Sequence, residues 1–537
     1  MLSLTETIGR SVQEPRAATV CCVILGILLI NCLVKAVYRL WFHPLRRIPG
    51  PFLAKVTSLY FVPSTFKNDR VYRLRALHNK HGPAVRVGPN EVSLSDWRMY
   101  RRIYTEKTTL KEPRFYNPFS FLGHGNVFSV TTVFTDTADH AGRRKLQAKT
   151  YSQNEIRFHA SEILERTDVL IDRLLKLATD SPTQTADAYE MFGAWGIEII
   201  CKVLTDTKIP DDPSETIHTL KALESSPPTF FANILMPLLQ TFKLRTSIPG
   251  PLGHAYRAFA EWERRTASML KTFQNQSRDP DEKRQFGAAS LLDADNKHLG
   301  RKFQFREALE EAMGILLAGS GVSGHTFLYL TYALARPEGR RIQGRLRKEL
   351  EGAGDSLSEL TALPYLSAVI KETYRVFPAI MSTLPRILGQ SLEVVDTDII
   401  LPPGTVVGMQ NYVHHRDPVL FPKPDMFIPE RWLEGHELNQ DINLHDANAA
   451  LTPYSVGSRN CMGQTLAKTE LYLSVPRFVK RLDFSLSSKM KEDDMHMRDL
   501  WAVLPKGRRL FLDLKPLVSQ ARSVRHLATL YGLCFFH

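Results

Sequence analysis

Cysteine is scarce in this chain of 537 residues, and its spacing is not that of a disulfide framework. Three of the six cysteines share one apolar run and the others lie far apart: Cys21, Cys22, Cys32, Cys201, Cys461 and Cys534. Small secreted proteins that depend on disulfides carry closely spaced cysteines. The sequence therefore does not belong to that class, and we expect its main domain in a reducing compartment.

The sequence also has no internal repeat and no basic run interleaved with aromatic residues. With 43% hydrophobic and 23% charged residues, it is globular rather than disordered. The net charge is +13. We interpret this excess as attraction to a membrane surface and to an acidic partner, and we expect no nucleic-acid partner.

One apolar run, residues 17–34, is long enough to cross a bilayer. Four basic residues follow it: Lys35, Arg39, Arg46 and Arg47. The positive-inside rule places this side in the cytosol. An interfacial aromatic belt follows as well, formed by Tyr38, Trp41 and Phe42. A cleaved signal peptide is the alternative. Signal peptides carry their positive charge before the apolar run, whereas this chain carries it after the run, so an anchor is favoured.

Hydrophobic periodicity predicts a mainly α domain after the stiff segment Ile48-Pro49-Gly50-Pro51. Residues 84–94 read as a β-hairpin, residues 225–251 as two short helices with a mobile loop, and residues 385–403 as a small β-rich part. The expected longer helices are 152–176, 188–204, 305–334, 340–351 and 365–377. The helix 305–334 is unusual because it contains Gly314, Gly319, Gly321 and Gly324. Close packing against another helix or a flat ligand against the backbone would each account for them.

The segment 454–463 is a glycine-punctuated loop with one cysteine, Cys461, and it runs into a helix start at Gln464. A thiol at a helix N-terminus is pushed toward thiolate, which is a good soft ligand for iron. Gly457 allows a tight turn and Gly463 a close approach of the helix start to a flat cofactor. A buried structural cysteine is the alternative for a cysteine considered alone.

Other motifs precede this loop. Glu372 and Arg375 share one helix face at i and i+3, and Pro429-Glu430-Arg431-Trp432 stands between them and Cys461. In this order and spacing, the motifs resemble the E-x-x-R helix, the P-E-R-F/W segment and the F-x-x-G-x-R-x-C-x-G loop of cytochrome P-450, with Tyr454 for the usual Phe. The segment 43–51 resembles the entry segment of filamentous-fungal members. The resemblance covers roughly residues 35–517.

The resemblance implies a membrane-anchored haem-thiolate monooxygenase with the cytochrome P-450 fold and heme b as cofactor. Cys461 would ligate the iron, and Glu372, Arg375 and Arg431 would form a buried triad that steadies the haem loop. His140, Arg144, Arg386 and Arg459 would meet the haem propionates, with His140 replacing the family's Trp as a pH-sensitive donor. A solvated basic helix is the alternative for His140 and Arg144.

The long helix departs from the family pattern. Where the family has an acid followed by Thr, this chain has Gly321 and Val322. That pair normally holds the water that delivers protons, and such a relay is worth about 10²–10⁴ in rate. Ser323 is the expected substitute, with Ser320 and His325 as less favoured ones; a substrate hydroxyl or ordered water would also serve.

The sequence therefore predicts an enzyme that uses O₂ and NADPH-derived electrons to oxidise an apolar small molecule in fungal secondary metabolism. A haem-thiolate isomerase, dehydratase or peroxygenase, and a non-catalytic haem-binding membrane protein, remain as alternatives. The expected partner is NADPH-cytochrome P-450 reductase, docking on basic residues chosen from Arg143, Lys145, Lys149 and Lys468. The substrate pocket is expected to involve residues 115–134, Phe230-Phe231, the Gly319 helix face and residues 379–384.

The expected organisation has five parts. They are a lumenal N-terminal segment (1–16), a single-pass anchor in the endoplasmic reticulum membrane (17–37), a Pro-rich hinge (38–51), a cytosolic catalytic domain (52–517) and a C-terminal tail (518–537).

Overall fold

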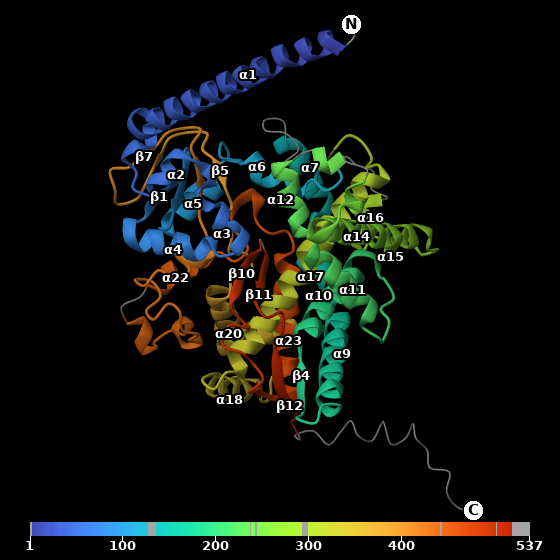
Figure 1. Cartoon of the computed structure of the whole chain (residues 1–537). Helices are drawn as coiled ribbons and strands as arrows, with labels where there is room; N and C mark the ends of the chain where they lie inside the picture. The colour runs from blue at the N-terminus through green and yellow to red at the C-terminus, as the bar shows by residue number, and fades with distance from the viewer. Residues whose placement is uncertain are drawn as a thin grey trace, which may run out of the picture.

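A long helix through the centre of the molecule organises the fold of this chain (Figure 1). The computed structural model describes residues 3–126, 136–236, 238–241, 244–292, 299–440, 443–500 and 502–517. The expected tail, residues 518–537, lies outside the described residues. The central helix, α17, spans Phe305–Ala335 and begins with a capping box between Gln304 and Glu307. Most of its residues are buried, as expected for a core helix.

The domain is mainly helical. The longer helices are α1 Ser3–Val37, α4 Arg70–His81, α7 Asp136–Ala148, α9 Ala160–Thr179, α10 Tyr189–Thr205, α11 Ser214–Ser225, α14 Gly250–Asn275, α17, α18 Gly339–Leu350, α20 Pro364–Val376 and α23 Gln464–Arg481. The shorter ones are α2 Phe52–Val56, α3 Val62–Lys67, α5 Arg98–Tyr104, α6 Pro113–Tyr116, α8 Gln153–Phe158, α12 Pro227–Leu235, α13 Leu238–Thr241, α15 Pro280–Lys283, α16 Gly287–Leu292, α19 Leu357–Ala362, α21 Asn411–His414 and α22 Leu444–Ala450.

The strands form four small sheets. They are β1 Ala84–Gly88, β2 Glu91–Leu94, β3 Leu110–Lys111, β4 Thr185–Asp187, β5 Arg386–Ile387, β6 Leu392–Glu393, β7 Ile400–Leu401, β8 Val406–Gly408, β9 Leu482–Leu486, β10 Met497–Leu500, β11 Ala502–Pro505 and β12 Phe511–Pro516. The largest sheet has the order β1-β2-β8-β5-β3 and is antiparallel except where β2 pairs with β8. The others are β4-β12-β9, β10-β11 and β6-β7.

Two buried clusters form the interior. The larger one joins α9, α10, α17, α20 and α23, and the smaller one lies under the five-stranded sheet, around Val92, Leu94 and Met409. In Figure 1 the sheet lies with α2 and α5 to one side of α17, and α9, α11 and α14 lie to the other. This is a mainly α fold with a small β-rich region, as predicted.

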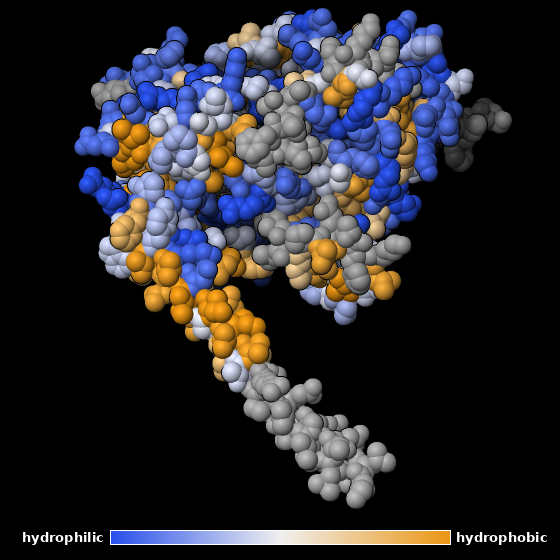
Figure 2. Space-filling view, turned by 90° about the horizontal axis from the view of Figure 1, so that it is seen from above, coloured by the Kyte–Doolittle hydropathy of each residue, from blue (hydrophilic) through white to orange (hydrophobic). Residues whose placement is uncertain are grey.

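Helix α1 extends away from this body (Figure 2). Its segment Ala18–Phe42 has a mean hydropathy of 2.6, and none of its most apolar window is buried in the protein. Apolar surface continues at the base of this helix in Figure 2, and the segments that follow α1 carry large exposed apolar side chains: Trp41, Phe42, Phe52, Leu53, Leu59 and Phe66. An apolar helix without protein contacts fits a membrane span. The helix begins at Ser3, earlier than the expected start at residue 17.

Most expected elements are present, and the differences have local causes. The β1–β2 hairpin, α10, α17, α18, α20 and the two short helices α12 and α13 match the predictions. The expected helix 152–176 is interrupted at His159, which caps α9 with a non-helical backbone. Helices α11 and α14 were not predicted. Helix α14 starts with Gly250-Pro251, at the end of the segment expected to hold two short helices and a loop, and proline is well tolerated in a first helical turn.

The glycines of α17 pack mainly against another helix. A Cβ at Gly324 would lie 2.5 Å from the carbonyl oxygen of Phe192 in α10, and one at Gly319 would lie 2.6 Å from Ile200. On the facing helix, a Cβ at Gly196 would lie 2.4 Å from the carbonyl oxygen of Ser320. Of the two explanations for this glycine-rich helix, close helix packing therefore holds for Gly319 and Gly324.

We expect Gly324→Ala to lower the free energy of unfolding by about 1–3 kcal/mol, because the added methyl group meets backbone that cannot move aside. Gly344→Ala in α18 is the matched control. Nothing lies within 4 Å of its Cβ position, so helix propensity alone raises stability there, by up to about 1 kcal/mol. Urea denaturation followed by circular dichroism measures both. Equal effects of the two substitutions would refute close α10–α17 packing.

Candidate haem site

The loop 454–463 closes on itself and leads into α23. The backbone N–H of Cys461 donates to the carbonyl oxygen of Tyr454 at 2.8 Å. Gly457 has φ +75°, and a Cβ there would lie 2.6 Å from the carbonyl oxygen of Tyr104 in α5. The close approach that requires this glycine is therefore to α5. Nothing lies within 4 Å of the Cβ position of Gly463, so the α23 end of the loop borders open space.

The Cys461 side chain is accessible to solvent. Protein atoms nevertheless surround the thiol closely, and this burial is the largest influence on its pKa. Both observations fit a thiol that faces a narrow space inside the protein. Burial raises the pKa of the Cys461 thiol, although the N–H of Gly463 and the charge of Arg144 act in the opposite direction. The expected lowering of this pKa is wrong for the polypeptide itself. Coordination to a metal would remove the proton outright.

Cations gather near the loop. Arg386, in β5, is buried; its Nη1 donates to the Tyr116 hydroxyl at 2.5 Å, and its guanidinium lies over the rings of Tyr104 and Tyr116. Among the described residues, it forms no ion pair with a carboxylate. A buried cation of this kind is costly unless an anion completes the site.

His140, in α7, lies within the influence of several of the cations near this loop. Burial lowers the pKa of its imidazole to about 2, helped by the charges of Arg459, Lys111, Arg144 and Arg143, in that order. In the polypeptide alone, the pKa of His140 therefore lies far below neutral pH, unlike that of the pH-sensitive donor we expected. The ring is also buried, which argues against a solvated basic helix.

Arg144 reaches the loop directly. Its Nη1 donates to the carbonyl oxygen of Asn460 at 2.7 Å, and its Nη2 donates to the side-chain oxygen of Asn460. Charge interactions link His140 with Arg144 and Arg459, Arg386 and Arg459 both act on Tyr116, and Arg144 also acts on the Cys461 thiol. A soft thiol with cations on the neighbouring elements suits an iron porphyrin, whose two carboxylates need such partners.

The prediction that Arg143 is a surface cation available to a partner protein is wrong. Only 2% of its side chain is exposed, and it pairs with Asp139 at 2.7 Å and with Glu311 at 2.9 Å. It therefore links α7 to α17 and cannot contact a partner protein. Lys145, Lys149 and Lys468 are exposed.

Glu372, in α20, is the centre of a buried hydrogen-bond network. Its carboxylate accepts two bonds from Arg375 at 2.9 Å and one from Arg431 at 3.0 Å. Trp432 Nε1 and the backbone N–H of Ile428 donate at 2.9 and 2.8 Å. Although burial acts to raise it, Arg375 and Arg431 hold the pKa of Glu372 below its usual value. The expected triad is thus assembled away from the haem loop itself.

Two sets of contacts connect the Glu372 network and helix α20 to the loop that carries Cys461. Arg375 Nη1 donates to the carbonyl oxygen of His415 at 3.1 Å, and His415 Nε2 accepts from the backbone N–H of Thr452 at 3.0 Å. Beside it, the hydroxyls of Tyr374 and Tyr454 are 2.5 Å apart. Tyr454, at the position of the family's Phe, thus has a hydroxyl partner in α20 that the sequence pattern did not reveal.

Ser323 does not point where the sequence suggested. Its hydroxyl faces Glu470 of α23, a fully buried acid whose carboxyl oxygens have no hydrogen-bond partner of good geometry. Burial raises the pKa of Glu470 to about 7, and Ser323 opposes this shift. Ser323 is also not among the residues that line the large cavity described next.

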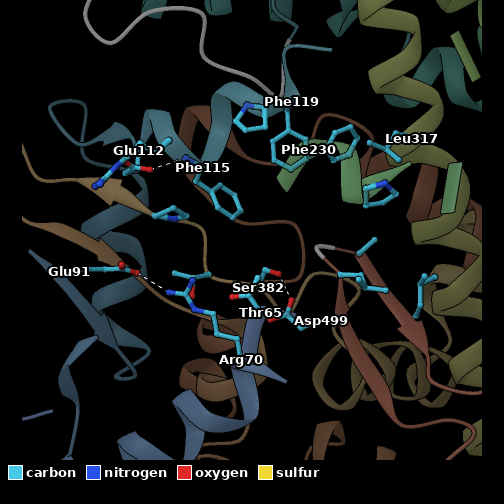
Figure 3. Close-up of a pocket in the computed structure, with 18 of the residues that line it drawn as sticks. Thr65, Arg70, Glu91, Glu112, Phe115, Phe119, Phe230, Leu317, Ser382 and Asp499 are labelled. Atoms are coloured by element: carbon cyan, nitrogen blue, oxygen red, sulfur yellow. Dashed lines mark hydrogen bonds and ion pairs between the residues drawn. The ribbon is translucent and has the colours of Figure 1, made fainter. Parts of the chain in front are cut away.

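A cavity of about 560 Å³ lies beside α17 (Figure 3). Its apolar part is formed by Phe115, Phe119, Leu220, Leu223, Phe230 and Leu317. Opposite them lie the pairs Arg70–Glu91 and Ser382–Asp499 (Figure 3). From α17, the lining residues are Leu317, Ser320, Gly321 and His325. A partly open cavity with an apolar wall that faces a polar one is compatible with a small-molecule site.

Several residues of the regions expected to form the substrate pocket line this cavity: Phe115, Pro118, Phe119, Phe230, Ser382 and Thr383. Gly319 instead faces Ile200 of α10. Residues 127–134 and the side chain of Phe231 lie outside the described part of the chain.

The cytochrome P450 family model matches residues 49–511. The chain belongs to the cytochrome P450 family. The P450 monooxygenase tazI of Aspergillus terreus is 27% identical over 91% of this chain and 97% of its own length. Versicolorin B desaturase stcL of Emericella nidulans is 26% identical over 91% and 96%. The retinoic-acid-bound cyanobacterial CYP120A1 shares the fold, with a TM-score of 0.65, 18% identity and coverage of 82% and 93%.

These findings confirm the predicted family, fold and enzyme class. This P450 is a monooxygenase of the filamentous-fungal type, and membership of the family implies a haem whose iron is bound by a cysteine thiolate. None of these relatives is named an isomerase, dehydratase, peroxygenase or non-catalytic haem protein, although one is named a desaturase.

We expect Glu372→Gln to lower the free energy of unfolding by about 3–5 kcal/mol, because two buried guanidinium groups lose their shared counter-charge. Glu215→Gln is the control, since its partner Arg265 lies 2.6 Å away but the Glu215 side chain is 71% exposed. Such a surface pair is worth under about 1 kcal/mol. Urea denaturation compares them, and similar losses would contradict a structural role of the triad.

Glu470 generates a pH-dependent prediction. In the native state its pKa is about 7, whereas the unfolded chain ionises near 4.5, so the native state holds the proton longer. Stability should therefore fall as the pH rises from 4.5 to 7 and then level off. Glu470→Gln should raise the free energy of unfolding by up to about 3 kcal/mol at about pH 8 and by little near about pH 5. A gain of equal size at both pH values would refute this assignment.

Proposed function

We propose that Cys461 is the axial thiolate ligand of heme b, and that His140, Arg144, Arg386 and Arg459 bind its propionates. The observation that carries this proposal is the accessible thiol of Cys461 just before α23, together with a buried guanidinium, Arg386, that has no carboxylate partner in the described structure. When bound, the haem supplies the oxygen-activating chemistry. The polypeptide supplies the thiolate, the cations and the cavity beside α17.

The cavity beside α17 is the proposed substrate site. Its apolar side chains favour a substrate with little polar surface, and its volume of about 560 Å³ suits a small organic molecule. The relatives include a versicolorin B desaturase and several fungal P450 monooxygenases. We propose hydroxylation, epoxidation or a related oxidation in fungal secondary metabolism.

We propose that residues 17–37 anchor the protein in the endoplasmic reticulum membrane, with residues 1–16 lumenal and the catalytic domain, residues 52–517, in the cytosol. The exposed apolar helix supports the anchor, and the basic residues from Lys35 to Arg47 support the orientation. Residues 38–51 connect the two, and residues 518–537 form a separate tail.

NADPH-cytochrome P450 reductase is the proposed electron donor. Lys145 and Lys149, at the end of α7 and just beyond it, and Lys468 in α23 are exposed near the loop that carries Cys461. Cations arranged there complement an acidic partner, and such complementarity acts mainly on the association rate.

Cys461→Ser is expected to abolish the thiolate-type Soret band of the reduced CO complex, because serine cannot supply the sulfur ligand. Cys201→Ser is the matched control: Cys201 is buried in α10, where burial raises the pKa of its thiol to about 12. It should keep the band. A thiolate-type band in the Cys461→Ser protein would overturn the ligand assignment.

The reaction itself is tested with the full-length protein and a purified reductase in lipid vesicles. Apolar compounds are first screened for a ligand-induced spin shift, and NADPH and O₂ consumption are then compared with oxygenated product. Product formed without reductase would contradict the proposed electron route.

A further inference from the structure

The cavity beside α17 has two walls of different chemistry, and each wall comes from a different part of the fold (Figure 3). The apolar wall is helical: Phe115 lies in α6, Phe230 in α12 and Leu317 in α17. On the polar wall, Glu91 belongs to β2 of the five-stranded sheet and Arg70 to the neighbouring helix α4. A ligand that fills this space therefore meets apolar groups on one side and hydrogen-bonding groups on the other.

Most polar groups that line the cavity are already engaged within the protein. The Ser382 hydroxyl donates to the carboxylate of Asp499, and Glu112 pairs with Arg114 at 2.8 Å. Arg39 donates to a backbone carbonyl oxygen at 2.6 Å. These interactions satisfy the groups without a ligand, so they give little indication of what the cavity binds.

The pair formed by Arg70 and Glu91 is the exception. Nη2 of Arg70 donates to Oε1 of Glu91 at 3.0 Å, and each side chain is 30% exposed. Among the described residues, neither Nη1 of Arg70 nor Oε2 of Glu91 has a hydrogen-bond partner. Both atoms are accessible, in contrast to the buried Nε of Arg70. The lining of the cavity thus offers an open donor together with an open acceptor.

The charges of this pair restrict the kind of group that can bind to it. A hydroxyl group accepts one hydrogen bond and donates another, so it can use Nη1 of Arg70 and Oε2 of Glu91 together. A carboxylate would meet the negative charge of Glu91, and an ammonium group would meet the positive charge of Arg70. Because the two charges compensate each other, an uncharged hydroxyl is the group that meets no repulsion.

The opposite wall suits a ring-shaped apolar body. The ring centres of Phe115 and Phe119 are 6.0 Å apart, and those of Phe119 and Phe230 are 5.6 Å apart. Both pairs are tilted, so the three rings form one aromatic cluster. A further ring packs well on such a cluster, either offset or edge-on.

We propose that the ligand of this cavity is an uncharged amphiphile, whose hydroxyl group bonds to Nη1 of Arg70 and Oε2 of Glu91 while its apolar rings pack on Phe115, Phe119 and Phe230. This inference rests on the proposed use of the cavity as the substrate site. Arg70 and Glu91 select and orient the ligand, and they take no part in the reaction itself.

The test measures binding to the full-length holoenzyme in lipid nanodiscs, by equilibrium dialysis, with empty discs of the same lipid as the blank. The probes share one ring skeleton: 2-naphthol, naphthalene and 2-naphthoate. Near neutral pH 2-naphthol is uncharged, like other phenols, whereas 2-naphthoate is an anion. We expect 2-naphthol to bind about tenfold more tightly than either of the others, as a hydrogen bond to a charged group allows.

The variants separate the polar anchor from the apolar wall. Arg70→Met keeps the apolar stem but removes the donor, so it should weaken 2-naphthol about tenfold and leave naphthalene unchanged. Glu91→Gln keeps the shape but removes the charge, so 2-naphthoate should bind more tightly than in the wild type. Arg75→Met is the matched control: Arg75 lies in the same helix, pairs with Asp425 at 2.7 Å and is not part of the lining. It should change neither ligand.

Each result decides one question. Equal binding of 2-naphthol and naphthalene to the wild type, or equal losses of both in Arg70→Met, overturns the proposed anchor but not the substrate site. Tightest binding of 2-naphthoate makes the pair an anion site and also overturns it. If Arg70→Met does not fold, unchanged 2-naphthoate binding in Glu91→Gln refutes the anchor. If none of the three probes binds, the substrate site itself is wrong, and the Soret band of the reduced CO complex reports separately on the haem site.

Discussion

A single buried carboxylate, Glu372, fixes the side of the molecule that carries Cys461. It sits in α20, yet every group that donates to it from another segment belongs to residues 428–432, more than fifty positions later in the chain. A charge buried this deeply is tolerated only when it is fully paired, so the two segments cannot separate without exposing an unpaired ion. Through Arg375 and His415, this constraint reaches Thr452 and the start of the haem loop.

The opposite side of the site depends on glycine. Gly319 and Gly324 allow α17 to lie against α10, because side chains there would overlap Ile200 and the backbone of Phe192. Gly321 has another role: it meets only the ring of His325, and it leaves space in the cavity. In this one helix, glycine allows close packing against α10 at two positions and lines the cavity at a third.

The sequence was sufficient for the family and for most helices, because these follow from motifs with fixed spacing and from local periodicity. It was not sufficient where a role depends on the direction of a side chain. Arg143 and Arg144 are neighbours in a basic helix, but one is buried against Glu311 and the other reaches Asn460. Tyr454 stands where the family has Phe, and the partner of its hydroxyl, Tyr374, lies 80 positions earlier in the chain. Such pairs join residues far apart in sequence, so no local pattern reveals them.

Ser323 and His325 show the same limit on opposite faces of α17. Ser323 faces Glu470, which has no cation beside it and whose pKa burial raises to about 7. His325 faces Glu224, which Arg508 and Tyr189 keep ionised, and it borders the cavity. The two buried acids therefore differ: Glu224 keeps its charge near neutral pH because a cation lies within reach, whereas Glu470 holds its proton up to about pH 7.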